Sequence, residues 1–137
     1  MGINIDDLTL GEIRQIQALC IGITPTLKTQ ESAHPLAHLI GQKVIVRGSK
    51  SGVNYGTLKY VGGGTVILTN ARRLHYWVVK DKAGISLSDV AKHGLNKESR
   101  VCAIIEEQSI IDGDAGEIIT TTDAAQKSIE AQDVYRP

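Results

Sequence analysis

Residues 43–79 read KVIVRGSKSGVNYGTLKYVGGGTVILTNARRLHYWVV, and this stretch decides the fold. Its β-branched and aromatic runs alternate with glycine-rich breaks, which is the pattern of short strands joined by tight turns. The triplet Gly62-Gly63-Gly64 leads from one strand into the next, so it predicts a hairpin turn. A phosphate-binding loop would instead lead into a helix N-terminus. We predict an antiparallel meander of four strands, at 43–47, 53–61, 65–69 and 72–79.

Two short helices and further strands are predicted after this meander. Ser86 as a cap, Asp89 in the first turn and Gly94 at the end predict one helix. Thr122 can cap a second helix that runs to Ala131. The remaining apolar and β-branched runs predict two or three more strands, at 101–105, 109–111 and 117–121.

The N-terminal part has a different pattern. Apolar side chains recur at helical spacing over residues 8–21, and the stretch up to Pro35 has no periodicity. We therefore divide the chain into an N-terminal helix and linker, 1–35, and a β-rich ligand-binding domain, 36–137. The helix must bury its apolar side against its own domain or against a second chain, in which case it is an oligomerisation arm. The predicted fold class is α+β, a small antiparallel β barrel or sandwich core with an N-terminal helix and two further short helices.

Charge is distributed unevenly along a chain whose formal net charge is zero. From Gly41 to Arg100, eleven Lys and Arg residues stand against three Asp and Glu residues, whereas both ends of the chain are acidic. A basic middle indicates either an anionic partner or neutralisation by other segments of the fold. The acidic C-terminal third would repel a long polyanion, so long nucleic acid is not the expected partner.

Signatures of catalysis, metal binding and membrane insertion are weak. His34 and His38 lack further residues at zinc-ligand spacing, and no catalytic triad or pair of poised acids is evident. No apolar run has the length of a membrane span, and the acidic N-terminus does not resemble a signal peptide. Cys20 and Cys102 lie in apolar segments and indicate buried free thiols in a reducing compartment. We expect no cofactor, no metal, no membrane partner and a protein that is not an enzyme.

Binding chemistry is better represented, because Tyr55, Tyr60, Tyr76 and Trp77 all lie in the basic middle. Aromatic faces stack on bases, and arginine forks bind phosphates through two hydrogen bonds. Alternation along a strand puts Arg73, His75 and Trp77 on one face, and Leu74, Tyr76 and Val78 on the more apolar face. We therefore predict that Arg73 and Trp77 share a ligand-binding face and that Arg72 lies at a subunit contact or in an ion pair. The alternative is that Trp77 or a tyrosine simply fills the core.

Four sequence runs resemble a family of small phage-encoded domains. They are Ile40–Arg47 (IGQKVIVR), Ser51–Leu58 (SGVNYGTL), Asn70–Trp77 (NARRLHYW) and Ser86–Ala91 (SLSDVA). The resemblance covers roughly residues 40–135. This chain departs from the family at the Leu74-His75 step, where an aromatic residue is usual, and in the loop after Trp77. The sequence is also similar to the anti-Thoeris sponge proteins of phages, which bind cyclic ADP-ribose-type immune signals, or in some cases cyclic oligonucleotides, without cleaving them.

The resemblance implies a homo-oligomer with ligand pockets at subunit contacts, acting in the cytoplasm of the infected bacterial host. Arginines would bind phosphates, Tyr76 or Trp77 would stack on a base, and Asn54 and serine hydroxyls would contact ribose or phosphate oxygens. Two other functions stay open, a nucleic-acid-binding accessory domain and a phage assembly protein that docks through its N-terminal helix. The candidate ligand-binding residues are Arg47, Ser51, Asn54, Tyr55, Arg72, Arg73, Tyr76, Trp77, Ser86 and Ser88.

Overall fold

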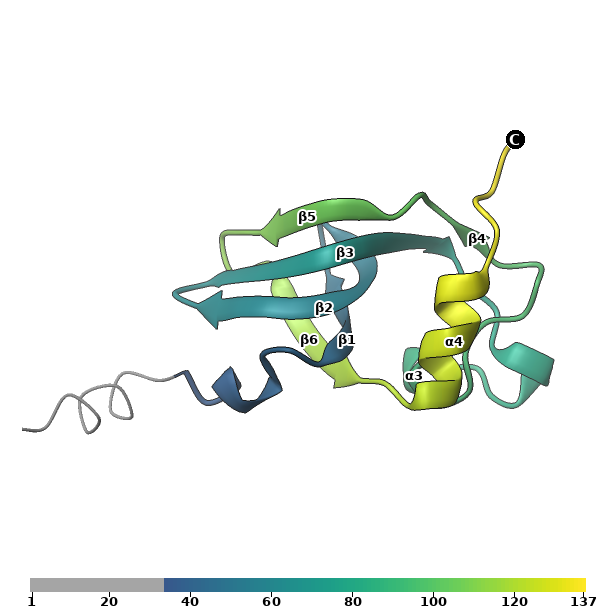
Figure 1. The fold of residues 1–137 in the computed structure, drawn as a ribbon, viewed down its shortest axis with the longest axis horizontal. Coiled ribbons are helices and arrows are strands. Elements are labelled where there is room, and N and C mark those ends of the chain that lie inside the picture. The colour runs from purple at the N-terminus through teal and green to yellow at the C-terminus, as the bar shows by residue number, and fades with distance from the viewer. Residues whose placement is uncertain (1–33) are drawn as a thin grey trace, which may run out of the picture. The chain divides into compact units, whose positions relative to one another are not determined.

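The computed structural model describes residues 34–137 (Figure 1). The fold described below is that of the unit Leu36–Pro137. The helix predicted at 8–21, the linker that follows it up to residue 33 and Cys20 lie outside the described residues. The elements are η2 (Ala37–Leu39), β1 (Lys43–Gly48), β2 (Gly52–Gly62), β3 (Thr65–Tyr76), η3 (Lys80–Lys82), α3 (Leu87–His93), β4 (Arg100–Val101), β5 (Ile105–Ile110), β6 (Ala115–Thr120) and α4 (Asp123–Ala131).

The strands form one six-stranded antiparallel sheet in the order β4-β3-β2-β1-β6, and β5 pairs with β3 on the same side as β4. The predicted α+β class and the two helices after the meander are confirmed. The sheet is not closed into a barrel. A short turn joins β5 to β6, but these strands do not pair with each other anywhere in residues 34–137. No helix in the same residues is long and apolar enough to cross a membrane.

Both faces of the central strands are buried. In β1, Val44 and Val46 point into one cluster and Ile45 into the other, and all three are fully buried, as the uninterrupted apolar run requires. We call the cluster around Ile45 the helix-side core, since it includes residues of α3 and α4, which Figure 1 shows side by side. Its buried members are Ile45, Tyr55, Leu74, Val79, Leu87, Val90, Ala91, Leu95, Val101 and Ile129.

The predicted turn at Gly62-Gly63-Gly64 is confirmed, and the predicted break at Asn70-Ala71 is wrong. Gly63 and Gly64 have φ values of 56° and 78°, which suit the tight turn between β2 and β3. At Asn70 (φ 50°) the chain makes a bulge and continues, so β3 is a single strand where two were predicted. A Cβ at Gly56, opposite the bulge, would lie 3.1 Å from the Leu68 side chain, which explains the glycine there.

Both predicted helix caps are confirmed. Ser86 Oγ accepts a hydrogen bond from the Asp89 amide, and Asp89 accepts one from the Ser86 amide, which completes a capping box. Hydrogen bonds donated by the Ser86 amide and hydroxyl to the Asp89 carboxylate lower the pKa of this carboxyl. Thr122 Oγ accepts from the Ala125 amide at the start of α4. By contrast, the prediction of a buried Cys102 thiol is wrong, because Cys102 is exposed between two edge strands.

Candidate functional site

The ten predicted site residues do not gather in one place. Arg47 is exposed on β1, directly opposite Glu117 of β6, in an open groove. Ser51 lies in the turn between β1 and β2, and its amide donates to Asp114 Oδ2 at 2.7 Å. Amide and hydroxyl groups of Ser51, Lys50 and Ser49 hold the pKa of the Asp114 carboxyl well below its usual range. Ser51 therefore belongs to a group of hydrogen bonds that connects this turn to Asp114, the residue before β6.

Asn54 and Arg73 are cross-strand neighbours on the face of the sheet that does not carry the helices. Asn54 is fully buried, and its Nδ2 donates to the carbonyl of Ser51 at 3.0 Å. Arg73 Nε donates to Asn54 Oδ1 at 3.2 Å, while the rest of the Arg73 side chain is exposed. This hydrogen bond holds Arg73 over the buried side-chain amide of Asn54.

The predicted faces of β3 are confirmed in part. Leu74 is buried, and Arg73 and His75 are exposed. Tyr76, predicted to be buried, is 51% exposed, and Trp77 packs against the helix-side core instead of sharing a face with Arg73. β3 ends at Tyr76, so two-residue alternation does not extend to Trp77, and the pairing of β3 with β4 shifts register between Leu74 and Tyr76. For Trp77 the core-filling alternative is the correct one.

Ser86 and Ser88 lie at the start of α3. Ser86 is used by the capping box, and Ser88 is exposed in the first turn. Neither serine lines the pocket that is formed in part by Tyr55 and Arg72 and is described next.

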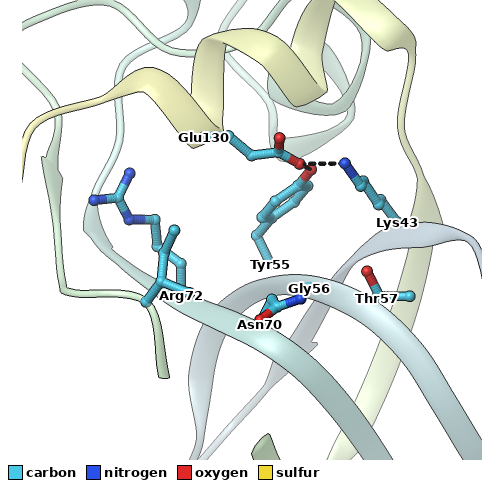
Figure 2. A pocket seen from close by; sticks show the side chains of 8 residues that line it. Lys43, Tyr55, Gly56, Thr57, Asn70, Arg72 and Glu130 are labelled. Atoms are coloured by element: carbon cyan, nitrogen blue, oxygen red, sulfur yellow. Dashed lines mark hydrogen bonds and ion pairs between the residues drawn. The ribbon is translucent and has the colours of Figure 1, made fainter. Parts of the chain in front are cut away.

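Tyr55 and Arg72 are the two predicted residues that the fold brings into a common pocket, of about 240 Å³. The pocket lies on the helix side of the sheet, between β1, β2 and β3 and the end of α4 (Figure 2). Figure 2 shows the Tyr55 ring between Arg72 and Lys43, with Glu130 of α4 above it. The full lining is Lys43, Tyr55, Gly56, Thr57, Asn70, Arg72, Ile104 and Glu130.

Glu130 connects the helix to the sheet inside this pocket. Its Oε2 lies 2.7 Å from Lys43 Nζ and accepts a 2.5 Å hydrogen bond from the Tyr55 hydroxyl. Partial burial alone would raise the pKa of the Glu130 carboxyl, but the hydrogen bonds from Lys43 and Tyr55 outweigh burial and lower this pKa. Burial first, and then the neighbouring carboxylate, raise the pKa of the Tyr55 phenol. Tyr55 thus stays a neutral donor and Glu130 a charged acceptor.

Arg72 is the buried cation of the pocket, with only 4% of its surface exposed. Its Nε donates to the Cys102 carbonyl at 2.8 Å, and its Nη1 donates to the carbonyls of Ile129 and Gln132 at 2.8 and 2.6 Å. The last two carbonyls end α4, where a cation is favourable. Burial lowers the pKa of the guanidinium, and the nearby Cys102 and Asp133 oppose this effect. The predicted ion pair of Arg72 is wrong within residues 34–137. Its hydrogen bonds go to neutral carbonyls, and Asp133 acts on it without forming an ion pair.

Sequence reasoning missed four polar residues of the pocket. Thr57 could have been found, because it lies two residues from Tyr55 on the same strand and therefore on the same face. Asn70 could not, because the bulge interrupts the alternation between it and Arg72. Lys43 is the cross-strand partner of Thr57, a pairing that needs the β1–β2 register. No sequence pattern pointed to Glu130, since 75 residues separate it from Tyr55.

Comparison with known proteins gives a family and nothing more specific. No curated protein matches the chain. A family model does match, over residues 41–129, which includes β1 to β6 and most of α4. That range holds the strands of the pocket and Arg72, and it ends one residue before Glu130. The chain belongs to this family, described as a domain of unknown function (DUF6948).

Proposed function

We propose that this domain is a non-catalytic binder of a small anionic nucleotide-type ligand, which it holds at the pocket around Arg72. One observation carries the proposal. Arg72 is almost completely buried, its hydrogen bonds within residues 34–137 go to carbonyl oxygens and none to a carboxylate, and it lines a pocket with Lys43. A desolvated cation without a paired carboxylate attracts an anion more strongly than a surface arginine does.

The other lining residues suit a phosphorylated sugar and base. A guanidinium and an ammonium group both bind phosphate oxygens. Thr57 supplies a hydroxyl and Asn70 an amide, which are partners for ribose or phosphate oxygens.

Ionisation states in the pocket favour binding over acid–base catalysis. The shifts at Glu130 and Tyr55 have opposite directions, and each keeps the group in its ordinary state at neutral pH. A general acid or base needs a pKa near the working pH. The two groups therefore act as a fixed polar wall of the pocket.

Pocket size favours a ligand shared between two copies of the chain. A volume of about 240 Å³ is below the roughly 300–1,000 Å³ of pockets that enclose drug-sized ligands. A cyclic ADP-ribose-type ligand would extend past the rim, where Ile104 is 48% exposed. We propose that a second copy covers the remainder, and that the protein sequesters a cyclic nucleotide immune signal in the cytoplasm of an infected host. The resemblance to phage sponge proteins supports this proposal.

The test is a thermal-shift screen of the purified full chain against cyclic ADP-ribose isomers and cyclic di- and trinucleotides. A ligand at a hundredfold excess over its Kd raises the free energy of unfolding by about 2.7 kcal/mol. The ligand should be recovered intact after the complex is denatured. Either a cleaved product or the absence of any shift across the screen would contradict the proposal.

A matched pair of lysine variants locates the site. Both lysines pair with a glutamate, Lys43 with Glu130 of α4 at 2.7 Å and Lys59 with Glu107 of β5 at 2.8 Å, but of the two only Lys43 lines the pocket. We expect Lys43→Gln to weaken the Kd about tenfold through the lost charge-assisted contact, and Lys59→Gln to leave it unchanged. Equal effects of the two variants would place the ligand elsewhere.

A further inference from the structure

A second group of side chains, outside the pocket, places one cation over two aromatic rings. The Arg100 guanidinium carbon lies 5.6 Å from the centre of the Tyr76 ring and 4.8 Å from that of the Tyr135 ring. The three residues come from the end of β3, from β4 and from the C-terminal segment after α4. We propose that this Tyr76–Arg100–Tyr135 stack is a separate binding site for the base and phosphate of a nucleotide. It does not depend on a ligand in the pocket.

The rings keep much of their surface in solvent. Tyr76 is 51% exposed and Tyr135 is 45% exposed, and Arg100 is exposed between them. A tyrosine whose one face is covered by a guanidinium still presents its other face or its edge. Bases of any identity stack on such rings, and an arginine plane adds a cation–π contribution.

The charge of the stack is uncompensated. Within the described part of the chain, Arg100 makes neither an ion pair nor a side-chain hydrogen bond, and its only marked contacts are the two ring faces. Its N–H groups lie in the guanidinium plane, so stacking leaves them free to donate to an anion. A phosphate accepts two such hydrogen bonds in parallel.

The two features together select the ligand class. An acidic peptide would use the guanidinium but not the rings, and an apolar partner would use the rings while leaving the guanidinium desolvated without a partner. A nucleotide places a planar base and an anionic phosphate within one small molecule, so it uses both.

The stack is built before any ligand arrives. Tyr76 and Arg100 are cross-strand partners, and the Tyr135 amide donates to the Val101 carbonyl at 3.0 Å. Val101 is 1% exposed and also bridges to Val134, which holds the C-terminal segment against β4. Since the backbone positions all three side chains, little conformational freedom is lost on binding.

The experiment uses adenosine 5′-monophosphate as the probe, with adenosine and ribose 5-phosphate as the two half-ligands. Binding to the full chain is followed by NMR of the Arg100 Nε–H and the tyrosine rings. We expect the whole nucleotide to shift the Arg100 and Tyr135 signals, and to bind about tenfold more tightly than either half. If ribose 5-phosphate binds as tightly as the nucleotide, the rings do not stack on the base. If adenosine does so, Arg100 does not bind the phosphate. Either result overturns the proposal.

Three variants complete the test, and all change exposed side chains, so each is checked for an unaltered melting curve. Arg100→Lys keeps the charge but loses the planar fork, and Tyr135→Leu removes a ring. Each should weaken binding about tenfold. Tyr60→Leu is the matched control, because Tyr60 is 48% exposed on β2 and has no place in the stack. Equal affinity of all three variants, or no binding of the nucleotide to the parent, overturns the proposal.

Two further measurements distinguish a free nucleotide from single-stranded nucleic acid, and the stack from the pocket. An eight-residue oligoadenylate presents the same base and phosphate, and a steep salt dependence of its binding would identify single-stranded nucleic acid as the source. Lys43→Gln should leave the Arg100 shift intact, since Lys43 lines only the pocket. A loss of the shift in this variant would show that the stack is not separate and overturn the inference. Failure of the pocket proposal, by contrast, would leave the shift in the parent protein.

Discussion

The two faces of β3 treat neighbouring arginines in opposite ways. Arg72 is buried beneath α4 and donates three hydrogen bonds to carbonyl oxygens, whereas Arg73, the next residue, is exposed and donates one to Asn54. The residue type and the local sequence are shared, so the difference comes from what packs on each face. The comparison teaches that the covering of each strand face, and not the residue type, decides what an arginine contacts, so we expect the two arginines to differ in their contribution to stability.

Arg72→Met removes the buried arginine and should have the largest effect on the free energy of unfolding. The variant keeps much of the apolar stem but leaves the carbonyls of Cys102, Ile129 and Gln132 without their donor. Unsatisfied groups of this kind are costly, so we expect the free energy of unfolding to fall by about 2–4 kcal/mol. Urea denaturation followed by circular dichroism measures this loss. A fall below 1 kcal/mol would mean that water replaces the guanidinium at the end of α4.

The free energy of unfolding at alkaline pH tests the buried face through Tyr55, which lines the pocket together with Arg72. The pKa of Tyr55 is raised in the fold, so the folded state retains a proton that the unfolded chain releases above about pH 10. Stability is therefore fully present below pH 10 and falls as the pH rises beyond it, with a slope of up to about 1.4 kcal/mol per pH unit from this group. Denaturation at pH 9, 10 and 11 measures the slope.

Tyr55→Phe is the control for that slope. It removes the ionisable hydroxyl together with its hydrogen bond to Glu130, and it should lower stability at pH 7 by about 1 kcal/mol while flattening the alkaline decline. Lys59→Gln, which alters an exposed ion pair, should keep the decline of the parent. If the Tyr55→Phe variant declines as steeply as the parent, the slope belongs to another group.

Arg73→Met tests the exposed half and should have the smallest effect. It removes the hydrogen bond to Asn54 Oδ1, while Asn54 Nδ2 keeps its bond to the Ser51 carbonyl. The Arg73 guanidinium itself is exposed, so water can take its place over the buried Asn54, and we expect a loss of about 0.5–1 kcal/mol in urea denaturation. A loss equal to that of Arg72→Met would show that the two faces of β3 do not differ in the way that burial indicates.

Much of the fold could be predicted because its signals are local. The capping box at Ser86 and Asp89, the Thr122 cap and the glycine turn after β2 each depend on a few adjacent residues. The break predicted at Asn70 failed for the opposite reason. A residue in the left-handed region either ends a strand or forms a bulge inside one, and only the pairing of β3 with β2 decides which.

The candidate sites depended far less on local pattern. Sequence alone determined that Arg72 and Arg73 point to opposite faces of a strand and that Leu74 is buried between exposed neighbours, because alternation is a property of the extended backbone. Only the tertiary structure decided that α4 covers the Arg72 face, that Glu130 reaches Tyr55, and that the C-terminal segment brings Tyr135 to Arg100. These contacts join segments distant in the chain, and they form because the apolar side of α4 must be buried against the sheet. The local sequence shows that α4 has an apolar side, but not which surface covers it.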